Sequence, residues 1–159
     1  MKKSIVIVAA LLLVVTGVVA AVHLSNQEQI ACMVIRQGNR QEELSFRDLE
    51  GYPFSGELTD GKGDTRFHEY TGILLRELLE KKGFDLSGLH SVTVTSADQY
   101  SAAFTAEEIL QKDCVYAAVV ADGAKIKGID PGSDGVQIIV FGDSDSRRCV
   151  RYARIITLE

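Results

Sequence analysis

The sequence predicts one domain of the α+β class, with mixed, mostly antiparallel sheets and two or three short helices. Runs of β-branched residues alternate with turn signals, which is typical of strands that pair with their neighbours along the chain. Only one segment carries a clear helical period, so a doubly wound sheet is not expected. A length of 159 residues and a hydrophobic content of 46% suffice for a single packed core.

Residues 1–22 are predicted to be a signal peptide or an N-terminal membrane anchor, separate from the fold. Lys2 and Lys3 precede an uncharged apolar run at residues 5–22. These 18 residues are long for a signal core and just long enough to span a bilayer, so cleavage and anchoring both stay open. In either case we expect export, with the domain secreted or held outside the cytoplasm. A polar tether at residues 23–29 then leads to the domain at residues 30–159.

The charge balance restricts the partners. Without residues 1–21, 15 basic residues face 22 acidic ones, a net charge of −7. Such a domain repels phosphate backbones, so nucleic acid is not expected as a partner. The partners we expect are a small anionic ligand or a protein at the cell surface, with membrane contact only through the N-terminal segment.

The first half of the domain predicts strands around one helical turn. The run at residues 30–38 ends at a Gly-Asn pair, which indicates a strand and a turn. Ser45 is placed to cap a single helical turn. The glycine-rich segment at residues 53–72 fits a hairpin whose tip is the stretch "TDGKGDT".

The clearest helical pattern is "TGILLRELLEKKGF", at residues 71–84. Its leucines recur at i,i+4 spacing, and charged residues occupy the other face. Thr71 is placed to cap the start of the helix, and Gly83 is placed to end it in the left-handed conformation.

The second half predicts further strands around a short helix. Residues 90–97 alternate between drier and wetter side chains, and the following "YSAAF" fits a short return strand. Thr105 and Glu108 form a capping box at the start of "TAEEIL". A buried strand then ends at the two-residue hairpin signal Asp122-Gly123. The stretches "VQIIVFG" and "RRCVRYARIITL" supply the last two strands.

The chain has three cysteines, Cys32, Cys114 and Cys149, and no C-x-x-C pair. An odd number leaves at least one thiol free. Three small buried apolar side chains and one disulfide between two of the three are both compatible with the sequence.

The order of several short motifs carries a family resemblance. "LSFRDL" (44–49) is followed by a glycine that leads into the leucine-rich helix, and then by the corner "SADQY" (96–100). The acidic "EEIL", the "VVADG" turn and the basic "RCVR" (148–151) follow. Over residues 30–159 this order resembles the oxidoreductase molybdopterin-binding domain, the fold of the sulfite oxidase family.

The resemblance implies molybdopterin as cofactor, but one ligand is absent. In catalytic family members a cysteine thiolate from the segment before the leucine-rich helix binds molybdenum. That segment corresponds to residues 61–70, which contain no cysteine, and the three cysteines present map to strands elsewhere. Hard ligands such as Asp64, His68 or Glu69 are no equal replacement for a thiolate. The cofactor therefore stays unknown, and enzymatic activity is not the expected function.

The candidate binding residues are Arg148, Arg151, Asp98, Tyr100 and His68. The resemblance places Arg148 close to the phosphate of the pterin, and arginine is the usual side chain for bidentate anion binding. The alternative is that these arginines pair with nearby acids such as Asp143 and Asp145, or with Glu159.

The corner and the histidine also have structural explanations. Asp98 can serve as a turn acceptor and Tyr100 as packing, at a corner that resembles the family's crossover from strand to helix. Gln99 stands where family members usually carry glycine; if φ is positive there, glutamine costs about 1 kcal/mol or more. His68 shares one side of a predicted strand with Arg66 and Tyr70, which is either an anion site or an ordinary wet face.

These patterns predict an exported, non-catalytic module that binds a small ligand or a partner. One alternative is a molybdenum cofactor-dependent oxidoreductase with an altered metal ligand. A second is a structural or interaction domain without a ligand. The sequence contains no P-loop, no G-x-S-x-G motif and no paired zinc ligands.

Overall fold

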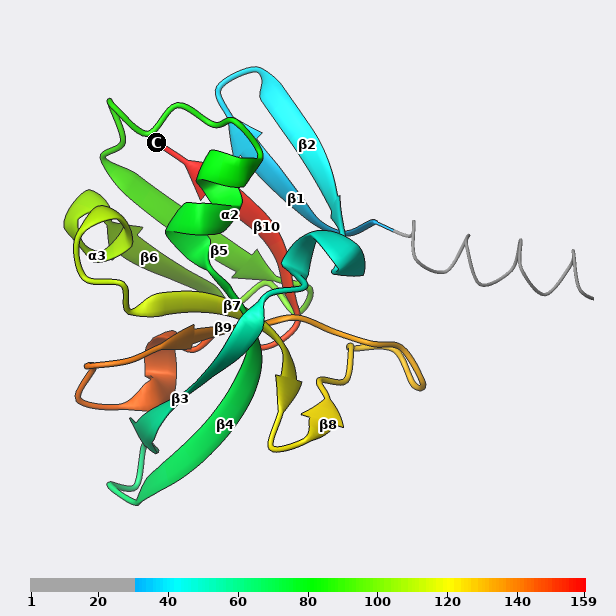
Figure 1. The fold of residues 1–159 in the computed structure, drawn as a ribbon, viewed down its shortest axis with the longest axis vertical. Helices are drawn as coiled ribbons and strands as arrows, with labels where there is room; N and C mark the ends of the chain where they lie inside the picture. The colour runs from blue at the N-terminus through cyan, green and yellow to red at the C-terminus, as the bar shows by residue number, and fades with distance from the viewer. Residues whose placement is uncertain (1–30) are drawn as a thin grey trace, which may run out of the picture. The chain divides into compact units, whose positions relative to one another are not determined.

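The computed structural model describes residues 31–159, and the predicted leader and tether lie outside this range. The strands are β1 (Ala31–Gln37), β2 (Arg40–Ser45), β3 (Tyr52–Thr59), β4 (Thr65–Leu74), β5 (Ser91–Ser96), β6 (Ser101–Thr105), β7 (Val115–Ala121), β8 (Ala124–Lys125), β9 (Gln137–Val140) and β10 (Ala153–Leu158). The helices are α2 (Leu75–Lys81) and α3 (Ala106–Leu110), with 3-10 turns η1 (Phe46–Leu49) and η2 (Ser146–Arg148) (Figure 1). Within residues 31–159, no helix combines the length and the hydropathy needed to cross a membrane.

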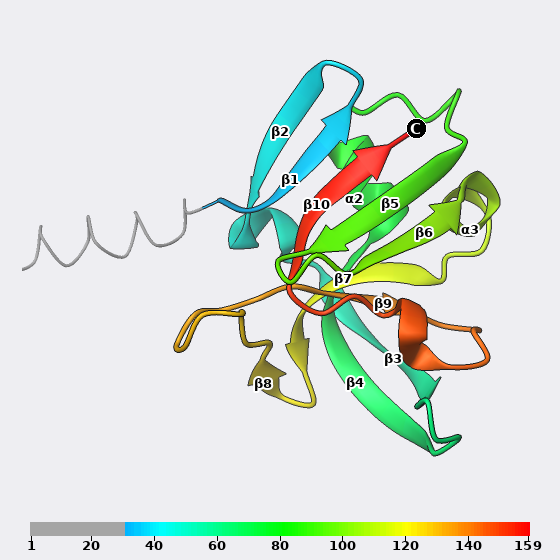
Figure 2. The same cartoon turned by 180° about the vertical axis from the view of Figure 1, so that it is seen from behind.

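The strands form two sheets, and the predicted α+β class is confirmed. One sheet has the order β2-β1-β10-β5-β6; the other has the order β3-β4-β7-β8, with β9 also paired to β7. Every pair is antiparallel except β1 with β10, which brings the two ends of the described chain together. Figure 2 shows β10 lying between β1 and β5.

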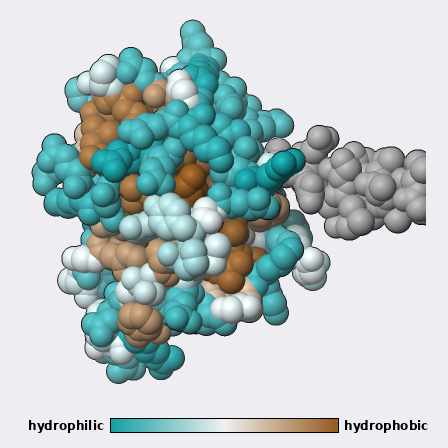
Figure 3. All heavy atoms as spheres, viewed as in Figure 1, coloured by the Kyte–Doolittle hydropathy of each residue, from teal (hydrophilic) through white to brown (hydrophobic). Residues whose placement is uncertain are grey.

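The core lies mainly beneath α2. Its three buried leucines, Leu75, Leu78 and Leu79, belong to one apolar cluster together with side chains of β1, β5, β7 and β9. A second, aromatic cluster lies on the sheet that contains β3, β4 and β7. There the rings of Phe54 and Tyr116 stack with centroids 4.2 Å apart. On the outer surface, hydrophobic side chains form separate patches among hydrophilic ones (Figure 3).

The leucine-rich helix begins later than predicted, while its end is confirmed. Thr71 does not cap the helix, because β4 continues to Leu74 and pairs there with β7. The backbone groups of this segment bond to a neighbouring strand, and that tertiary ladder overrides the local helical signal. At the other end Gly83 has φ +70°, and the N–H of Phe84 donates to the carbonyl of Leu79 at 3.0 Å. This arrangement is a Schellman motif.

The corner at residues 96–100 joins two strands, so the predicted crossover from strand to helix is wrong. The return strand "YSAAF" is confirmed as β6, which pairs antiparallel with β5. The N–H of Gln99 donates to the carbonyl of Ser96 at 3.1 Å, and Gln99 has φ +72°. Glutamine therefore occupies a left-handed position that favours glycine.

Other local expectations are confirmed as well. Asp122 and Gly123 have φ +49° and +77°, the conformation of a two-residue type I′ hairpin, and they join β7 to β8. The Thr105 N–H donates to the Glu108 carboxylate at 2.9 Å, and the Glu108 N–H donates to the Thr105 hydroxyl at 3.3 Å. This reciprocal pair is the predicted capping box.

The strain at Gln99 gives a first prediction. Gln99→Gly is expected to raise the free energy of unfolding by up to about 1 kcal/mol, because glycine adopts positive φ without a steric penalty. Urea denaturation followed by circular dichroism measures the change. The matched control is Gln111→Gly at φ −122°, where glycine only adds entropy to the unfolded chain and should lower stability. Equal destabilisation by both changes would contradict the prediction.

Candidate functional site

A cavity of about 520 Å³ lies between β4 and the segment that follows η2. Its first wall carries Arg66, His68 and Tyr70, which share one side of β4 because side chains alternate along a strand. The predicted triplet is therefore confirmed as a group. Tyr70 is buried, which raises the pKa of its phenol to about 12, so its hydroxyl stays protonated at neutral pH.

His68 is fixed in this wall by an acidic partner. Its Nδ1 lies 2.8 Å from Oδ2 of Asp122, and Oδ1 of Asp122 accepts the N–H of Glu69 at 3.0 Å. The hydrogen bond with His68 lowers the pKa of Asp122, as does the Glu69 N–H. The β7–β8 turn thus supplies a carboxylate that orients the imidazole at the cavity edge.

The second wall comes from a distant part of the chain and carries Ser146, Cys149 and Arg151. Cys149 was expected to lie elsewhere, and its place in this wall corrects that expectation. The N–H of Val140 donates to the Cys149 sulfur at 3.4 Å, and burial raises the pKa of the thiol. Without a bound metal, the Cys149 thiol is therefore protonated at neutral pH.

The cysteine alternatives are decided in favour of free thiols. Cys32 is buried, Cys114 and Cys149 are half-buried, and none of the three is bonded to another. The possibility of one disulfide is therefore not realised in this structure.

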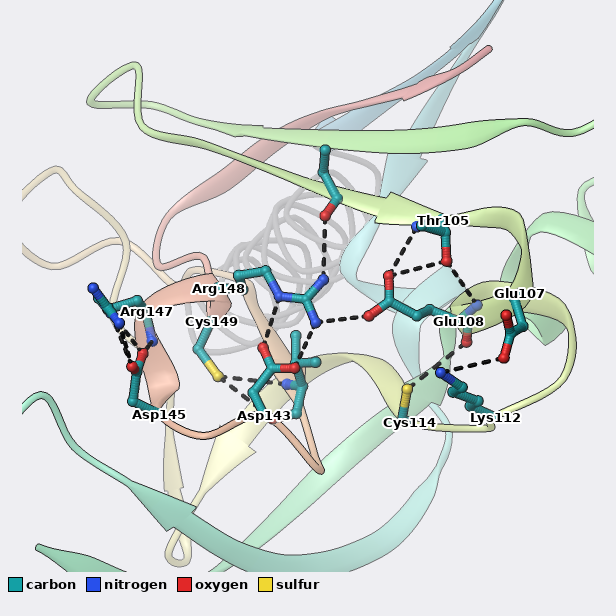
Figure 4. A network of polar contacts seen from close by, with 12 residues as sticks. Thr105, Glu107, Glu108, Lys112, Cys114, Asp143, Asp145, Arg147, Arg148 and Cys149 are labelled. Atoms are coloured by element: carbon teal, nitrogen blue, oxygen red, sulfur yellow. Dashed lines mark hydrogen bonds and ion pairs between the residues drawn. The ribbon is translucent and has the colours of Figure 1, made fainter. Parts of the chain in front are cut away.

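Arg148 lies outside the cavity, in a polar network between the two sheets (Figure 4). Its guanidinium donates to both carboxylate oxygens of Asp143, at 2.7 and 2.5 Å, and to Glu108 at 2.7 Å. A longer bond of 3.3 Å reaches the carbonyl of Ala103. Two carboxylates thus pair with the single charge of Arg148, which agrees with the expected alternative of arginine pairing with Asp143.

Arg147 is paired in the same way. Its guanidinium donates to both oxygens of Asp145, at 2.7 to 2.9 Å, as the same alternative expected. Glu159 instead accepts a hydrogen bond from the Ser91 hydroxyl at 3.1 Å.

Asp98 and Tyr100 also lie outside the cavity, but their corner contacts one of its walls. Asp98 accepts hydrogen bonds from the Ser96 hydroxyl and, at 3.2 Å, from the Tyr100 N–H. The Tyr100 hydroxyl donates to the carbonyl of Arg147 in η2 at 2.5 Å. Asp98 shapes the turn, and Tyr100 fastens η2 to the β5–β6 hairpin. Of the five candidate residues, His68 and Arg151 line the cavity, while Asp98, Tyr100 and Arg148 support the segment behind its second wall.

The other charged side chains of the cavity differ in whether they have a partner within the protein. Oδ1 of Asp60 accepts the backbone N–H groups of Lys62 and Asp64, which lowers the pKa of Asp60. Within residues 31–159, Arg66 and Arg151 form no ion pair and no side-chain hydrogen bond, and both are exposed. These two guanidinium groups are the cationic groups of the cavity that can bind a ligand.

Asp122 was recognised in the sequence only as a turn residue. No local signal marks its side chain as a partner of His68, because the two residues are 54 positions apart. Ser146 was likewise not singled out, since only the folding of η2 against the sheet brings it to the cavity.

The donor groups do not fit a molybdenum centre. No cluster of three or more His, Cys, Asp or Glu side chains suited to a metal ion occurs in the part of the chain that the structure describes. Residues 61–70, which form one wall, contain no cysteine, and the one thiol in the cavity lining, Cys149, already accepts a hydrogen bond from the Val140 N–H.

Comparison with known proteins supports the fold alone. No protein family model and no curated protein sequence matches the chain. Among solved structures, the chain is similar to the sulfane dehydrogenase SoxCD from Paracoccus pantotrophus, with a TM-score of 0.64 and 16% identity. The match covers 83% of this chain but only 38% of that one. It supports a distant likeness to the molybdopterin-binding fold that the motifs suggest.

The Arg148 network predicts a specific sensitivity to acid. The hydrogen bond from Arg148 lowers the pKa of Glu108 from its ordinary 4.5 to about 2. A lowered folded-state pKa stabilises the fold above pH 4.5, and this stability is lost as the pH falls toward 2. Glu108→Gln should therefore cost about 1–2 kcal/mol at pH 7 after allowance for solvent screening, and much less near pH 2, where the folded-state carboxylate becomes protonated.

Urea denaturation at both pH values checks this expectation. The matched control is Glu107→Gln, because Glu107 is exposed and pairs only with the exposed Lys112. The control should cost little at either pH. If the cost of Glu108→Gln does not shrink in acid, the carboxylate does not contribute in the way described.

The Tyr100 contact gives a third prediction. Tyr100→Phe removes one hydroxyl and should cost less than about 1 kcal/mol overall, because solvent reaches this side chain. Amide exchange should nevertheless become several-fold faster at Cys149, whose N–H donates to Ser146 within η2. Tyr52→Phe is the control, since the Tyr52 hydroxyl bonds to Glu77. Equal exchange at Cys149 in both variants would show that Tyr100 does not hold η2.

Proposed function

We propose that this chain is an exported, non-catalytic module that binds a small anionic ligand in the cavity between β4 and the segment after η2. The observation that carries the proposal is the position of Arg66 and Arg151. They come from segments far apart in the sequence, line the same cavity, and form no ion pair within residues 31–159. Arginine donors arranged in this way suit carboxylate, phosphate or sulfate groups.

The division of charge among the arginines supports the same proposal. Arg147 and Arg148, the adjacent basic residues, are each matched by carboxylates. In the cavity itself, Asp60 and Asp122 are already acceptors of hydrogen bonds from the protein. Incoming anions therefore meet two cationic donors that form no ion pair with a carboxylate of the described residues. The lysines and apolar run before residue 23 support export.

Binding of inorganic phosphate and sulfate, measured by calorimetry at low ionic strength, tests the proposal. Arg66→Ala and Arg151→Ala should each weaken binding roughly tenfold, as expected for the loss of a hydrogen bond from a charged group. The control Arg147→Ala removes an exposed arginine that is paired with Asp145, and it should leave the affinity unchanged. If all three variants bind like the parent protein, Arg66 and Arg151 do not form an anion-binding site. The alternative of a structural or interaction domain without a ligand is then supported.

One observation favours a second candidate function, a molybdenum cofactor-dependent oxidoreductase with an altered ligand. Cys149 lies in the cavity wall, so a thiol is present there, although not in the segment where the family carries it. Protein produced in a molybdenum-replete host should nonetheless contain no molybdenum, because the thiol is half-buried and already accepts a hydrogen bond from the Val140 N–H. Metal that is present in the parent protein and absent from Cys149→Ser would establish this alternative.

A further inference from the structure

The hydrogen bond between His68 and Asp122 determines whether the free ring nitrogen of His68 can donate a hydrogen bond to a ligand or accept one from it. An ionised carboxylate can only accept hydrogen bonds, so the proton between Nδ1 of His68 and Oδ2 of Asp122 belongs to the imidazole. With Nδ1 protonated, Nε2 of the neutral ring is an acceptor. Within residues 31–159, Nε2 has no hydrogen-bond partner.

The position of the Asp122 carboxylate is itself determined from three sides. The left-handed conformation at φ +49° fixes its direction within the type I′ turn. One oxygen accepts the Glu69 N–H, and the other faces His68. The orientation of the imidazole therefore follows from the β7–β8 hairpin and not from the ligand.

The cavity thus combines groups that only donate with a group that accepts. Arg66 and Arg151 donate, and they favour an oxyanion. His68 Nε2 in its neutral form can accept a hydrogen bond from the same ligand. His68 is only half-buried, so water can donate to Nε2 when a ligand does not. A ligand that displaces this water without donating a proton loses that hydrogen bond, so a ligand that carries a proton is preferred.

We propose that the cavity selects an oxyanion that still carries a proton, of the hydrogen phosphate type, over a fully deprotonated one such as sulfate, with His68 Nε2 as the discriminating acceptor. This inference rests on the proposed anion-binding function and names the ligand class of that site. Hydrogen phosphate and sulfate have the same charge and similar shape near pH 8, so charge alone gives no preference. The hydroxyl of hydrogen phosphate is the difference that His68 detects.

Other groups around the cavity are potential competitors for that proton. They are Asp60 and Asp64 in the β3–β4 loop, Tyr70 on β4, and Cys149 after η2. Asp60 already accepts two backbone N–H groups, and the phenol and the thiol both have raised pKa values. Asp64 is the acceptor that an experiment must separate from His68.

The test is a competition between three ligands at about pH 8, where histidine is ordinarily neutral. Inorganic phosphate is expected to bind at least about tenfold more tightly than sulfate. Methyl phosphate, whose second pKa lies near 6 as in other phosphate esters, has no proton at this pH and should behave like sulfate. Equal affinities for all three overturn the inference and leave the anion site intact, whereas no binding at all overturns both.

Asp122→Asn tests the role of the histidine. Asparagine tolerates the left-handed turn, and its amide oxygen can still accept the Glu69 N–H. Its NH2 group then faces Nδ1 of His68, so the imidazole proton moves to Nε2 and the acceptor becomes a donor. The variant should lose the preference for phosphate, with sulfate bound as tightly or more tightly.

Two control variants complete the design. Asp134→Asn changes an exposed carboxylate that pairs with Lys125 and should keep the full preference. Asp64→Asn should also keep the preference for phosphate over sulfate. If Asp64→Asn loses this preference and Asp122→Asn keeps it, the acceptor is Asp64 and not His68. Thermal unfolding of each variant shows that the fold is preserved.

Discussion

The Arg148 guanidinium is the contact on which the arrangement of the candidate site depends. It joins Glu108, which follows β6 of one sheet, to Asp143, which follows β9 of the other. The segment that begins at Asp143 continues through η2 to the second wall of the cavity. A bidentate arginine pair has fixed geometry as well as charge, so it holds this segment in one position relative to the hairpin of β5 and β6. Tyr100 adds a second, uncharged contact to the same turn.

This arrangement divides the arginines into those that are paired with carboxylates and those that are not. Arg147 and Arg148 are neutralised within the chain and stabilise the turn, whereas Arg66 and Arg151 face the cavity without a carboxylate partner in the described residues. A pair that is satisfied in the folded chain has little to offer a ligand, because binding would first have to break it. The distant likeness to a sulfane dehydrogenase concerns the backbone, and these side chains decide what the cavity can hold.

The local signals in the sequence were reliable where a short segment decides its own conformation. The capping box at Thr105, the hairpin at Asp122-Gly123 and the helix end at Gly83 all depend on residues within one turn of each other. The start of α2 was misjudged because Thr71 to Leu74 pair with β7, more than 40 residues away. The corner at Gln99 was likewise assigned to a crossover, although the pairing of β5 with β6 makes it a hairpin.

The sequence by itself determined the α+β class, most of the strands and the presence of Arg66, His68 and Tyr70 on one side of a strand, because these follow from local periodicity. It could not tell which arginines pair with carboxylates and which line the cavity without such a partner. That was decided by the tertiary structure, which places Arg148 between two acids and Arg151 in the cavity, although the two residues are close in sequence. The reason is physical: a charged side chain takes its role from the groups that folding places within hydrogen-bonding distance of it.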